Sequence, residues 1–127
     1  MSHIARVGCL IRDLDALAVA CAAKNAELRI GQKTFASYTT GSCEHAIGLL
    51  DNPTAYEIGL VRNGEAWDLA WDNYGMRGGA LQDRFGAGLV GLQNEYLAVV
   101  AEAQLRREGF MVSRVDEGQE IRLQAFA

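Results

Sequence analysis

Proline, long apolar runs and a secretory leader are scarce or missing in this sequence. Pro53 is the only proline, and no window reaches the about eighteen uninterrupted apolar residues that a membrane span needs. The opening stretch MSHIARVGCLIRDLD meets arginine and aspartate too early for a secretory signal. We therefore expect a cytoplasmic protein that does not engage a membrane.

Cysteine and histidine are too few and too widely spaced for a disulfide framework or a zinc site. Cys9, Cys21 and Cys43 form an odd set, whereas a disulfide framework needs pairs. Cys43 and His45 could ligate a metal together, but structural zinc needs a full tetrahedral set and only His3 and the other thiols remain. We expect free, buried thiols, no metal and no cofactor.

A basic excess is also lacking, since 12 Lys and Arg stand against 16 Asp and Glu for a net charge of −4. General polyphosphate binders usually show such an excess, because their cationic groups release counterions. Nucleic acid is therefore not the favoured partner. Apolar residues make up 50% of the sequence, which is typical of an ordinary soluble globular protein. The length of 127 residues predicts a single domain over residues 1–127.

The strongest structural signal that is present is YEIGLVRNGEAWDLAWD, residues 56–72, which reads as two strands joined at Asn63-Gly64. A two-residue loop there places Leu60 opposite Trp67. One face then carries the apolar side chains of a core, and we expect both tryptophans to pack beneath helices rather than to offer stacking platforms for a base or sugar. The core face consists of Tyr56, Ile58, Leu60, Trp67, Leu69 and Trp71.

The opposite face of the hairpin carries carboxylates. Asp68 and Asp72 share that face with Glu57, whereas Glu65 lies on the other. Such a group could bind a divalent cation or act as an acid/base pair, but we expect solvated charges on an exposed strand, because acidic residues are seldom buried. His3 has no fixed nucleophile or carboxylate beside it, so we expect a structural role and assign no catalytic residue.

Alternation and helical spacing place the remaining elements. A helix over 13–24 ends at Asn25, and a longer helix over 88–108 stops at Gly109. The longer helix has one apolar stripe and leaves Glu95 and its other polar residues for solvent or a partner. Strands are expected over 3–11, 27–30, 34–38, 110–115 and 120–126, with a turn at 31–33, while 46–50 reads as a strand or as part of a helical turn.

The resulting order is β-α-β-β-β-β-α-β-β. Helices are few and short turns join most strands, which is typical of antiparallel neighbours. We therefore predict an α+β fold in which an antiparallel sheet has two helices packed on one face.

A glycine-bearing segment, DNYGMRGGALQDRFGAGLVG (residues 72–91), follows the hairpin. Read as a loop, it can expose the backbone N–H groups of Gly78 and Gly79 near Arg77 and Arg84, a candidate site for a phosphate or carboxylate. Neither the GxxxxGKS/T nor the GxGxxG motif supports it. The competing interpretation is a loop that needs positive φ to turn from sheet into helix.

Four stretches resemble one known family. They are MSHIARVGCLIRDLDAL, YEIGLVRNGEAWDLAWDNYG, the LRREGF that ends the long helix, and the final EIRLQAF. In this order they resemble the chloroplast hypothetical reading frame thirty-five family, a domain of unknown function found in algal plastids, cyanobacteria, other bacteria and phages. The segment after the hairpin looks more like the bacterial and phage branch. The resemblance supports the element boundaries and implies no reaction, cofactor or catalytic residue.

These features favour a small non-enzymatic binding protein of unknown process. We expect it to engage a protein partner or itself through an open sheet edge or the polar face of the sheet. The alternative is a nucleic-acid or nucleotide/anion-binding protein that uses the glycine-rich loop with Arg77 and Arg84. A third hypothesis is an enzyme that acts through Asp68, Asp72 or His3.

Overall fold

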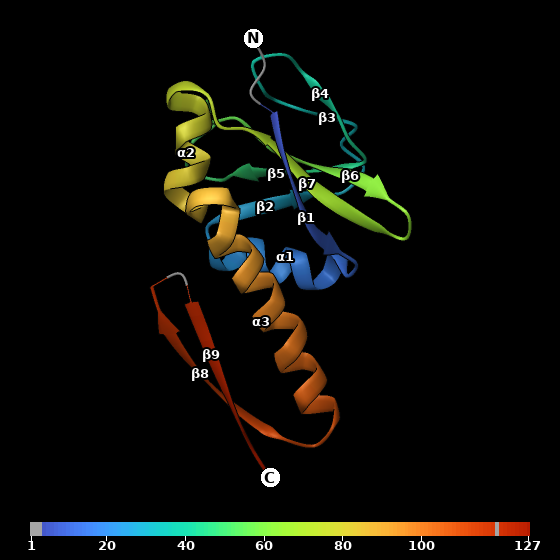
Figure 1. Cartoon of the computed structure of the whole chain (residues 1–127), viewed down its shortest axis with the longest axis vertical. Coiled ribbons are helices and arrows are strands. Elements are labelled where there is room, and N and C mark those ends of the chain that lie inside the picture. Colours follow the sequence, from blue (N-terminus) through green and yellow to red (C-terminus); the bar gives the residue numbers. More distant parts are fainter. Residues whose placement is uncertain (1–3, 119) are drawn as a thin grey trace.

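The computed structural model describes residues 4–118 and 120–127. In chain order its elements are β1 (Ile4–Ile11), α1 (Leu14–Ala23), β2 (Ala26–Arg29), β3 (Thr34–Phe35), β4 (Gly41–Ser42), β5 (His45–Leu49), β6 (Ile58–Asn63), β7 (Ala66–Asp72), α2 (Gly75–Phe85), the 3-10 turn η1 (Ala87–Leu89), α3 (Val90–Arg107), β8 (Met111–Glu117) and β9 (Glu120–Phe126). A main body is built on a five-stranded sheet, and an arm, consisting of α3, β8 and β9, extends from it (Figure 1).

The sheet of the body has the order β1-β7-β6-β5-β2, and each neighbouring pair is antiparallel. Side chains from α1, α2 and α3 join one face of this sheet in a single core. The α+β fold and its antiparallel sheet are thus confirmed, but the expected pair of helices omits α2. Fully buried members of the core include Leu17, Ile47, Ile58, Leu60, Leu69, Leu81, Phe85, Leu89 and Leu92.

The central hairpin pairs in a different register from the predicted one. Leu60 lies opposite Leu69 rather than Trp67. The two-residue loop therefore begins at Gly64, whose φ of +63° suits the first position of a type II′ turn. Because side chains alternate between faces, a slip of two residues leaves each of them on its predicted face. Trp67 and Trp71 accordingly lie in the core, as predicted.

A segment over residues 30–44, which we call the flap, contains β3 and β4 and covers the face of the sheet opposite the helices. Phe35 in the flap is only 2% exposed and packs against Ala46 and Ala70 of the sheet. A Cβ at Gly59 would lie 2.3 Å from the Phe35 ring. Glycine at this position therefore allows the ring to approach the strand.

One strand prediction, which concerned residues 27–38, is wrong at the flap. The segments 27–30 and 34–38 do not form a hairpin, because β2 pairs with β5 and β3 pairs with β4. Gly31, with a φ of +81°, lies where the chain leaves β2, so the following residues cross the sheet instead of extending it. The segment whose structure was left open between strand and helical turn is the strand β5.

Helix α1 has a capping side chain at its start and a residue of left-handed conformation after its end. The Oδ1 atom of Asp13 accepts a hydrogen bond from the N–H of Ala16 at 3.0 Å, and Asn25 follows the helix with a φ of 55°. The hydroxyl of Tyr96 in α3 accepts hydrogen bonds from the N–H groups of Arg12 and Asp13 at 3.0 and 3.1 Å. These bonds join the start of α1 to α3.

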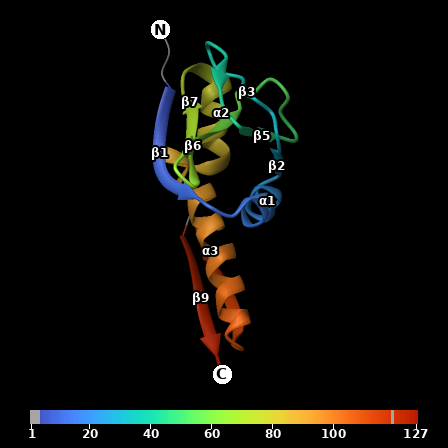
Figure 2. The same ribbon diagram turned by 90° about the vertical axis from the view of Figure 1, so that its right-hand side faces the viewer.

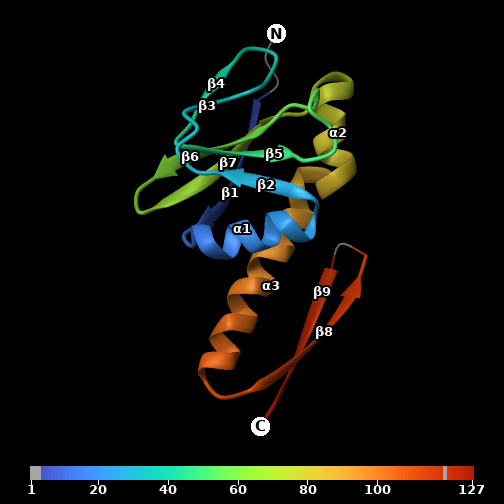
Figure 3. The ribbon, with the colours of Figure 1, turned by 180° about the vertical axis from the view of Figure 1, so that it is seen from behind.

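The arm is organised around α3, which begins in the core and continues beyond the body (Figures 1 and 2). Strands β8 and β9 form a two-stranded sheet of their own and lie along this helix (Figures 1 and 3). The last strand occupies residues 120–126 as predicted. No helix in the described ranges is both long enough and apolar enough to cross a membrane.

Candidate functional site

Asp68 and Asp72 of the hairpin are buried and Glu57 is half-buried, which corrects the expectation that these three carboxylates face solvent, whereas Glu65 is exposed. Asp72 is fully buried, and its carboxylate accepts hydrogen bonds from the N–H of Tyr38 at 2.8 Å and the N–H of Tyr74 at 2.9 Å. Glu57 accepts the N–H of Ala36 at 2.8 Å. Two of these three donors, Tyr38 and Ala36, belong to the flap, so the acids hold the flap on the sheet.

Asp68 is also a structural residue. It is 9% exposed and accepts hydrogen bonds from Arg6 at 3.2 Å and from the side-chain amide of Asn63 at 3.3 Å. Within residues 4–118 and 120–127, no group of three or more His, Cys, Asp or Glu side chains is placed to hold a metal ion. His3, the other residue considered for catalysis, lies outside the described residues.

Two of the three thiols can be placed. Cys21 is fully buried, and burial raises its pKa to about 12, while partial burial raises the pKa of Cys43. Both are free. The side chain of Cys9 lies outside the described ones. Raised pKa values keep both described thiols protonated near neutral pH and therefore poor nucleophiles.

The glycine segment is a helix, so its interpretation as a loop is wrong. Arg77, Gly78, Gly79 and Arg84 all lie in α2. The N–H of Gly78 donates to the carbonyl oxygen of Tyr74 at 3.2 Å, as expected in a helix, instead of pointing at a ligand. Gly78, Leu81 and Phe85 of this helix are buried. Their spacing of three and four residues is helical, but the many glycines in the segment favoured its interpretation as a loop.

Both arginines of α2 have contacts within the protein. The Nε atom of Arg77 donates to the carbonyl oxygen of Thr54 at 2.6 Å, and its guanidinium lies 4.7 Å from the centre of the Tyr56 ring. Arg84 donates to Asp51 at 2.6 Å and to two backbone carbonyls just after α1. The bond to Arg84 lowers the pKa of Asp51.

Two neighbouring glycines of α2 should respond in opposite ways to alanine. A Cβ at Gly78 would lie 2.4 Å from the carbonyl oxygen of Asp72, whereas a Cβ at Gly79 would have no atom within 4 Å. We expect Gly78→Ala to cost about 1–3 kcal/mol through overpacking and Gly79→Ala to stabilise by about 0.5–1 kcal/mol. Urea unfolding of both variants measures the difference; equal effects would contradict the close approach of α2 to β7.

A small pocket beside Arg77 keeps part of the anion hypothesis open. Its volume is about 200 Å³, and Arg29, Asn52 and Glu57 also line it. Arg29 forms an ion pair with Glu57, so the pocket combines two guanidinium groups, one amide and one carboxylate. Guanidinium groups suit a carboxylate or phosphate. Of the four predicted anion-site residues, only Arg77 is among the lining residues.

A polar cluster surrounds Trp67 near the turn of the central hairpin. Glu44 accepts the indole N–H of Trp67 at 2.9 Å and pairs with Arg62 at 3.1 Å, and these hydrogen bonds lower the pKa of Glu44. The ring of His45 lies edge-on to Trp67, and its Nδ1 accepts the N–H of Gly31 at 2.9 Å. Acceptance at Nδ1 requires an unprotonated nitrogen, and desolvation lowers the pKa of His45.

Folding stability should therefore fall as the pH drops from neutral. Because the pKa of His45 in the folded chain lies below its ordinary 6.5, the unfolded chain binds the proton more readily. The contribution of His45 is complete above pH 6.5 and is lost as the pH falls through the folded pKa. Glu44 adds a second loss below its ordinary 4.5. The urea midpoint of unfolding, measured as the pH is lowered from neutral, should decline less in His45→Gln than in the parent chain. The same dependence of the midpoint on pH in both chains would contradict the contribution of His45.

The hairpin of the arm is fixed to α3 through one face. Glu95 is 3% exposed, which corrects its expected position in solvent, and its two oxygens accept hydrogen bonds from the two terminal nitrogens of Arg114 at 2.6 Å each. These bonds raise the pKa of Arg114. Val112, Ile121 and Leu123 are half-buried on the same face. The arm thus has a paired charge and a thin apolar layer instead of a deep core.

The other face of this hairpin is exposed and partly apolar. Met111 and Phe126 lie opposite each other across the two strands, and they are 69% and 44% exposed. Val115 on the same face is also exposed. Two-stranded sheets are at best marginally stable in water, so this hairpin depends on what it contacts.

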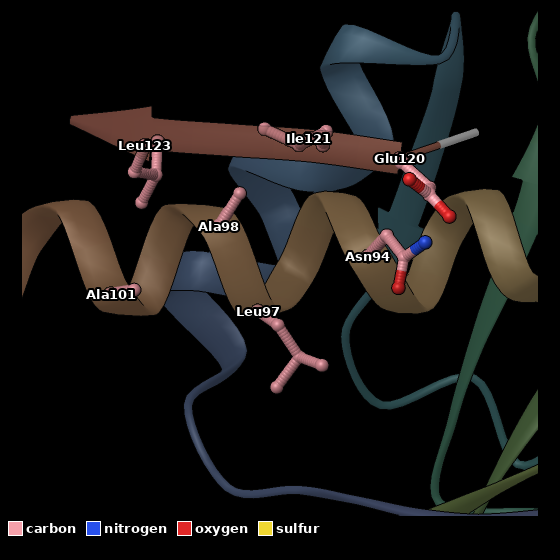
Figure 4. A pocket seen from close by; sticks show the side chains of 7 residues that line it. All are labelled: Asn94, Leu97, Ala98, Ala101, Glu120, Ile121 and Leu123. Carbon is pink, nitrogen blue, oxygen red and sulfur yellow. The ribbon is translucent and has the colours of Figure 1, made fainter. Parts of the chain in front are cut away.

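A groove of about 570 Å³ lies between α3 and β9 (Figure 4). Ala98 points toward the strand, whereas Leu97 points away from it and is 54% exposed. The lining residues are Asn94, Leu97, Ala98, Ala101, Glu120, Ile121 and Leu123.

Sequence reasoning missed a second stripe on α3. Val90, Asn94, Leu97 and Ala101 follow one another at intervals of four, three and four residues, which places them on one face of the helix. Of the apolar stripe predicted on this helix, Leu92 and Tyr96 lie in the core, Val99 and Val100 pack against it, and Ala103 is exposed. Val90 and Leu97 of the second stripe are exposed as well. The sequence signal that could have revealed the second stripe is the presence of apolar residues on two faces of one helix.

Comparisons of the chain with protein-family models, curated proteins and solved structures found no match. The resemblance to the chloroplast hypothetical reading frame thirty-five family therefore stays a prediction.

Proposed function

We propose that this is a small non-enzymatic protein that binds a protein partner through its arm. The observation that carries the proposal is the two-stranded sheet of β8 and β9, which pairs with no further strand in the described part of the chain. An unpaired strand edge accepts another strand through backbone hydrogen bonds. The groove beside β9 adds room for side chains of the partner.

The body is less suited to this role. Its polar sheet face, which was the other expected binding surface, is covered by the flap through Phe35 and through the bonds that Glu57 and Asp72 accept. The opposite face is covered by helices. The arm, unlike the two covered faces of the body, combines an unpaired strand edge, a groove and exposed apolar side chains.

Photo-crosslinking at Leu97 tests the proposal. A photoreactive amino acid that replaces Leu97 should trap a second polypeptide in cells that make the protein, because this side chain borders the groove and is 54% exposed. Val19, on α1 and 57% exposed, is the matched control position. Mass spectrometry of the adduct identifies the trapped chain. A Leu97 adduct no stronger than that at Val19 would overturn the proposal.

A second candidate function is the binding of a small anion in the pocket beside Arg77. The two guanidinium groups that line this pocket support it. Calorimetric titration with inorganic phosphate should release heat with the parent chain and with Arg84→Gln, because Arg84 does not line the pocket, but not with Arg77→Gln. Equal heats from both variants, or no heat from the parent chain, would remove this candidate.

A further inference from the structure

We infer that the partner of the arm is a second copy of this chain, and that the two copies pair β9 with β9 about a two-fold axis at Leu123. The inference rests on the proposed function and names its partner. The product is a continuous antiparallel sheet in the order β8-β9-β9-β8, with the two α3 helices side by side on one of its faces.

The features that such a pairing needs lie on one side of the arm. The groove is bounded by β9 and by Asn94, Leu97 and Ala101 of the second stripe of α3 (Figure 4). From Val90 to Ala101 the helix rises about 17 Å, and β9 extends about 20 Å. The strand edge and the helix stripe are therefore similar in length, and one partner can cover both.

The charges of β9 are compatible with pairing to itself. Strand β9 extends from 120 to 126, so its middle residue is 123. If the whole strand pairs with its copy, residue 123 lies opposite residue 123 of the other chain, and the remaining residues pair symmetrically about it. Opposite residues share a face in an antiparallel pair, and here no two like charges are opposite. The pairs are Leu123 with Leu123, Arg122 with Gln124, Ile121 with Ala125, and Glu120 with Phe126.

The other free edge of the hairpin does not fit a second copy in this way. Full self-pairing of β8, residues 111–117, would place Arg114 opposite the same arginine of the other copy. Like charges directly opposite each other destabilise a sheet. Arg114 is moreover held by Glu95 and by Asp116 at 2.7 Å, so it cannot turn away without breaking those bonds. The charge pattern therefore selects β9.

Pairing also resolves the weakness of the isolated hairpin. A sheet of more than two strands with a covered face is stable where a lone hairpin is marginal. Leu123 and Ile121 would lie under two helices instead of one, and Leu97 and Ala101 would lie between the helices, where the small alanine permits close approach. The interface is isologous, as in most homodimers.

Light scattering coupled to size-exclusion chromatography tests the stoichiometry. The parent chain should elute with twice the mass of one chain. Leu97→Glu should weaken the dimer by at least about tenfold, because it places two carboxylates between the helices, and Val19→Glu should remain dimeric. Circular dichroism verifies that both variants are folded. A parent chain that remains monomeric at high concentration, or equal behaviour of the two variants, would overturn the inference.

Disulfide trapping tests the register. Leu123→Cys should cross-link the two copies under mild oxidation, since Cβ atoms of directly opposite residues lie about 4.5–5.5 Å apart. Gln124→Cys should cross-link much less, because Gln124 faces Arg122 of the other copy. The parent chain measures the background from its own thiols. Faster trapping at 124 than at 123 would overturn the two-fold axis at Leu123.

The two levels of the proposal can fail separately. A monomeric parent chain combined with a Leu97 adduct to a different polypeptide would reject the second copy and leave the arm as a binding surface. A dimer that persists in Leu97→Glu, together with a Leu97 adduct no stronger than the Val19 control, would reject both.

Discussion

Asp72→Ala should destabilise the fold by about 3–5 kcal/mol, because it leaves two backbone donors without their charged acceptor. Asp72 is fully buried, and the N–H groups of Tyr38 and Tyr74 donate to separate oxygens of its carboxylate. Domains of this size are stable by only about 5–15 kcal/mol, so the variant should unfold at a much lower urea concentration than the parent chain.

The two donors give this prediction a local readout. One belongs to the flap and the other lies just before α2, so hydrogen exchange at Tyr38 and Tyr74 should accelerate in Asp72→Ala. Asp72→Asn retains one acceptor oxygen, so its stability should lie between that of the parent chain and that of Asp72→Ala. Asp83→Ala, at an exposed site on α2, should change stability by less than about 0.5 kcal/mol. Similar unfolding midpoints for the alanine variants at 72 and 83 would contradict the structural role of Asp72.

Gly59→Ala should cost about 2–4 kcal/mol by displacing the Phe35 ring. The new Cβ would lie 2.3 Å from Phe35 Cδ1 and 2.6 Å from Cε1, closer than carbon atoms approach. An aromatic ring cannot bend out of the way as the end of a lysine can. The ring must therefore lift, which exposes Ala46 and Ala70 beneath it. Thermal unfolding measures the loss.

A double-mutant cycle separates this clash from any general sensitivity of β6. Without the ring, the added methyl group has room, so Gly59→Ala should cost far less in a Phe35→Ala background than in the parent chain. Additive effects of the two substitutions would show that the ring is not what excludes a side chain at position 59.

Local patterns in the sequence predict the parts of this fold that depend on short-range periodicity. Alternation over residues 56–72 assigns both faces of the central hairpin correctly, and the faces survive the error in register because side chains repeat every second residue. Asp13 caps α1 because a carboxylate before a helix can accept a backbone N–H. The last strand is found for the same reason as the hairpin, since its alternation is regular.

Contacts between distant residues explain what the sequence could not show. Glycines disfavour a helix by propensity, yet a Cβ at Gly78 of α2 would lie 2.4 Å from the carbonyl oxygen of Asp72, so this contact needs the absence of a side chain. Alternation identifies the face that carries Glu57 and Asp72 but not the flap that covers it. Glu95 is buried because Arg114, 19 residues later, reaches it. Its helix alone gives no sign of that pairing.

The position of β1 in the sheet sets an order for folding during synthesis. β1 is an edge strand bonded to β7, and Ile11 pairs with Trp67, which the ribosome adds 56 residues later. At about 5–20 residues per second, that interval lasts several seconds. The largely apolar IARVGCLI must remain outside the sheet until its neighbour emerges. Strand β1 is therefore made well before the only strand it pairs with in the described sheet, and during this interval its apolar residues are open to misassociation.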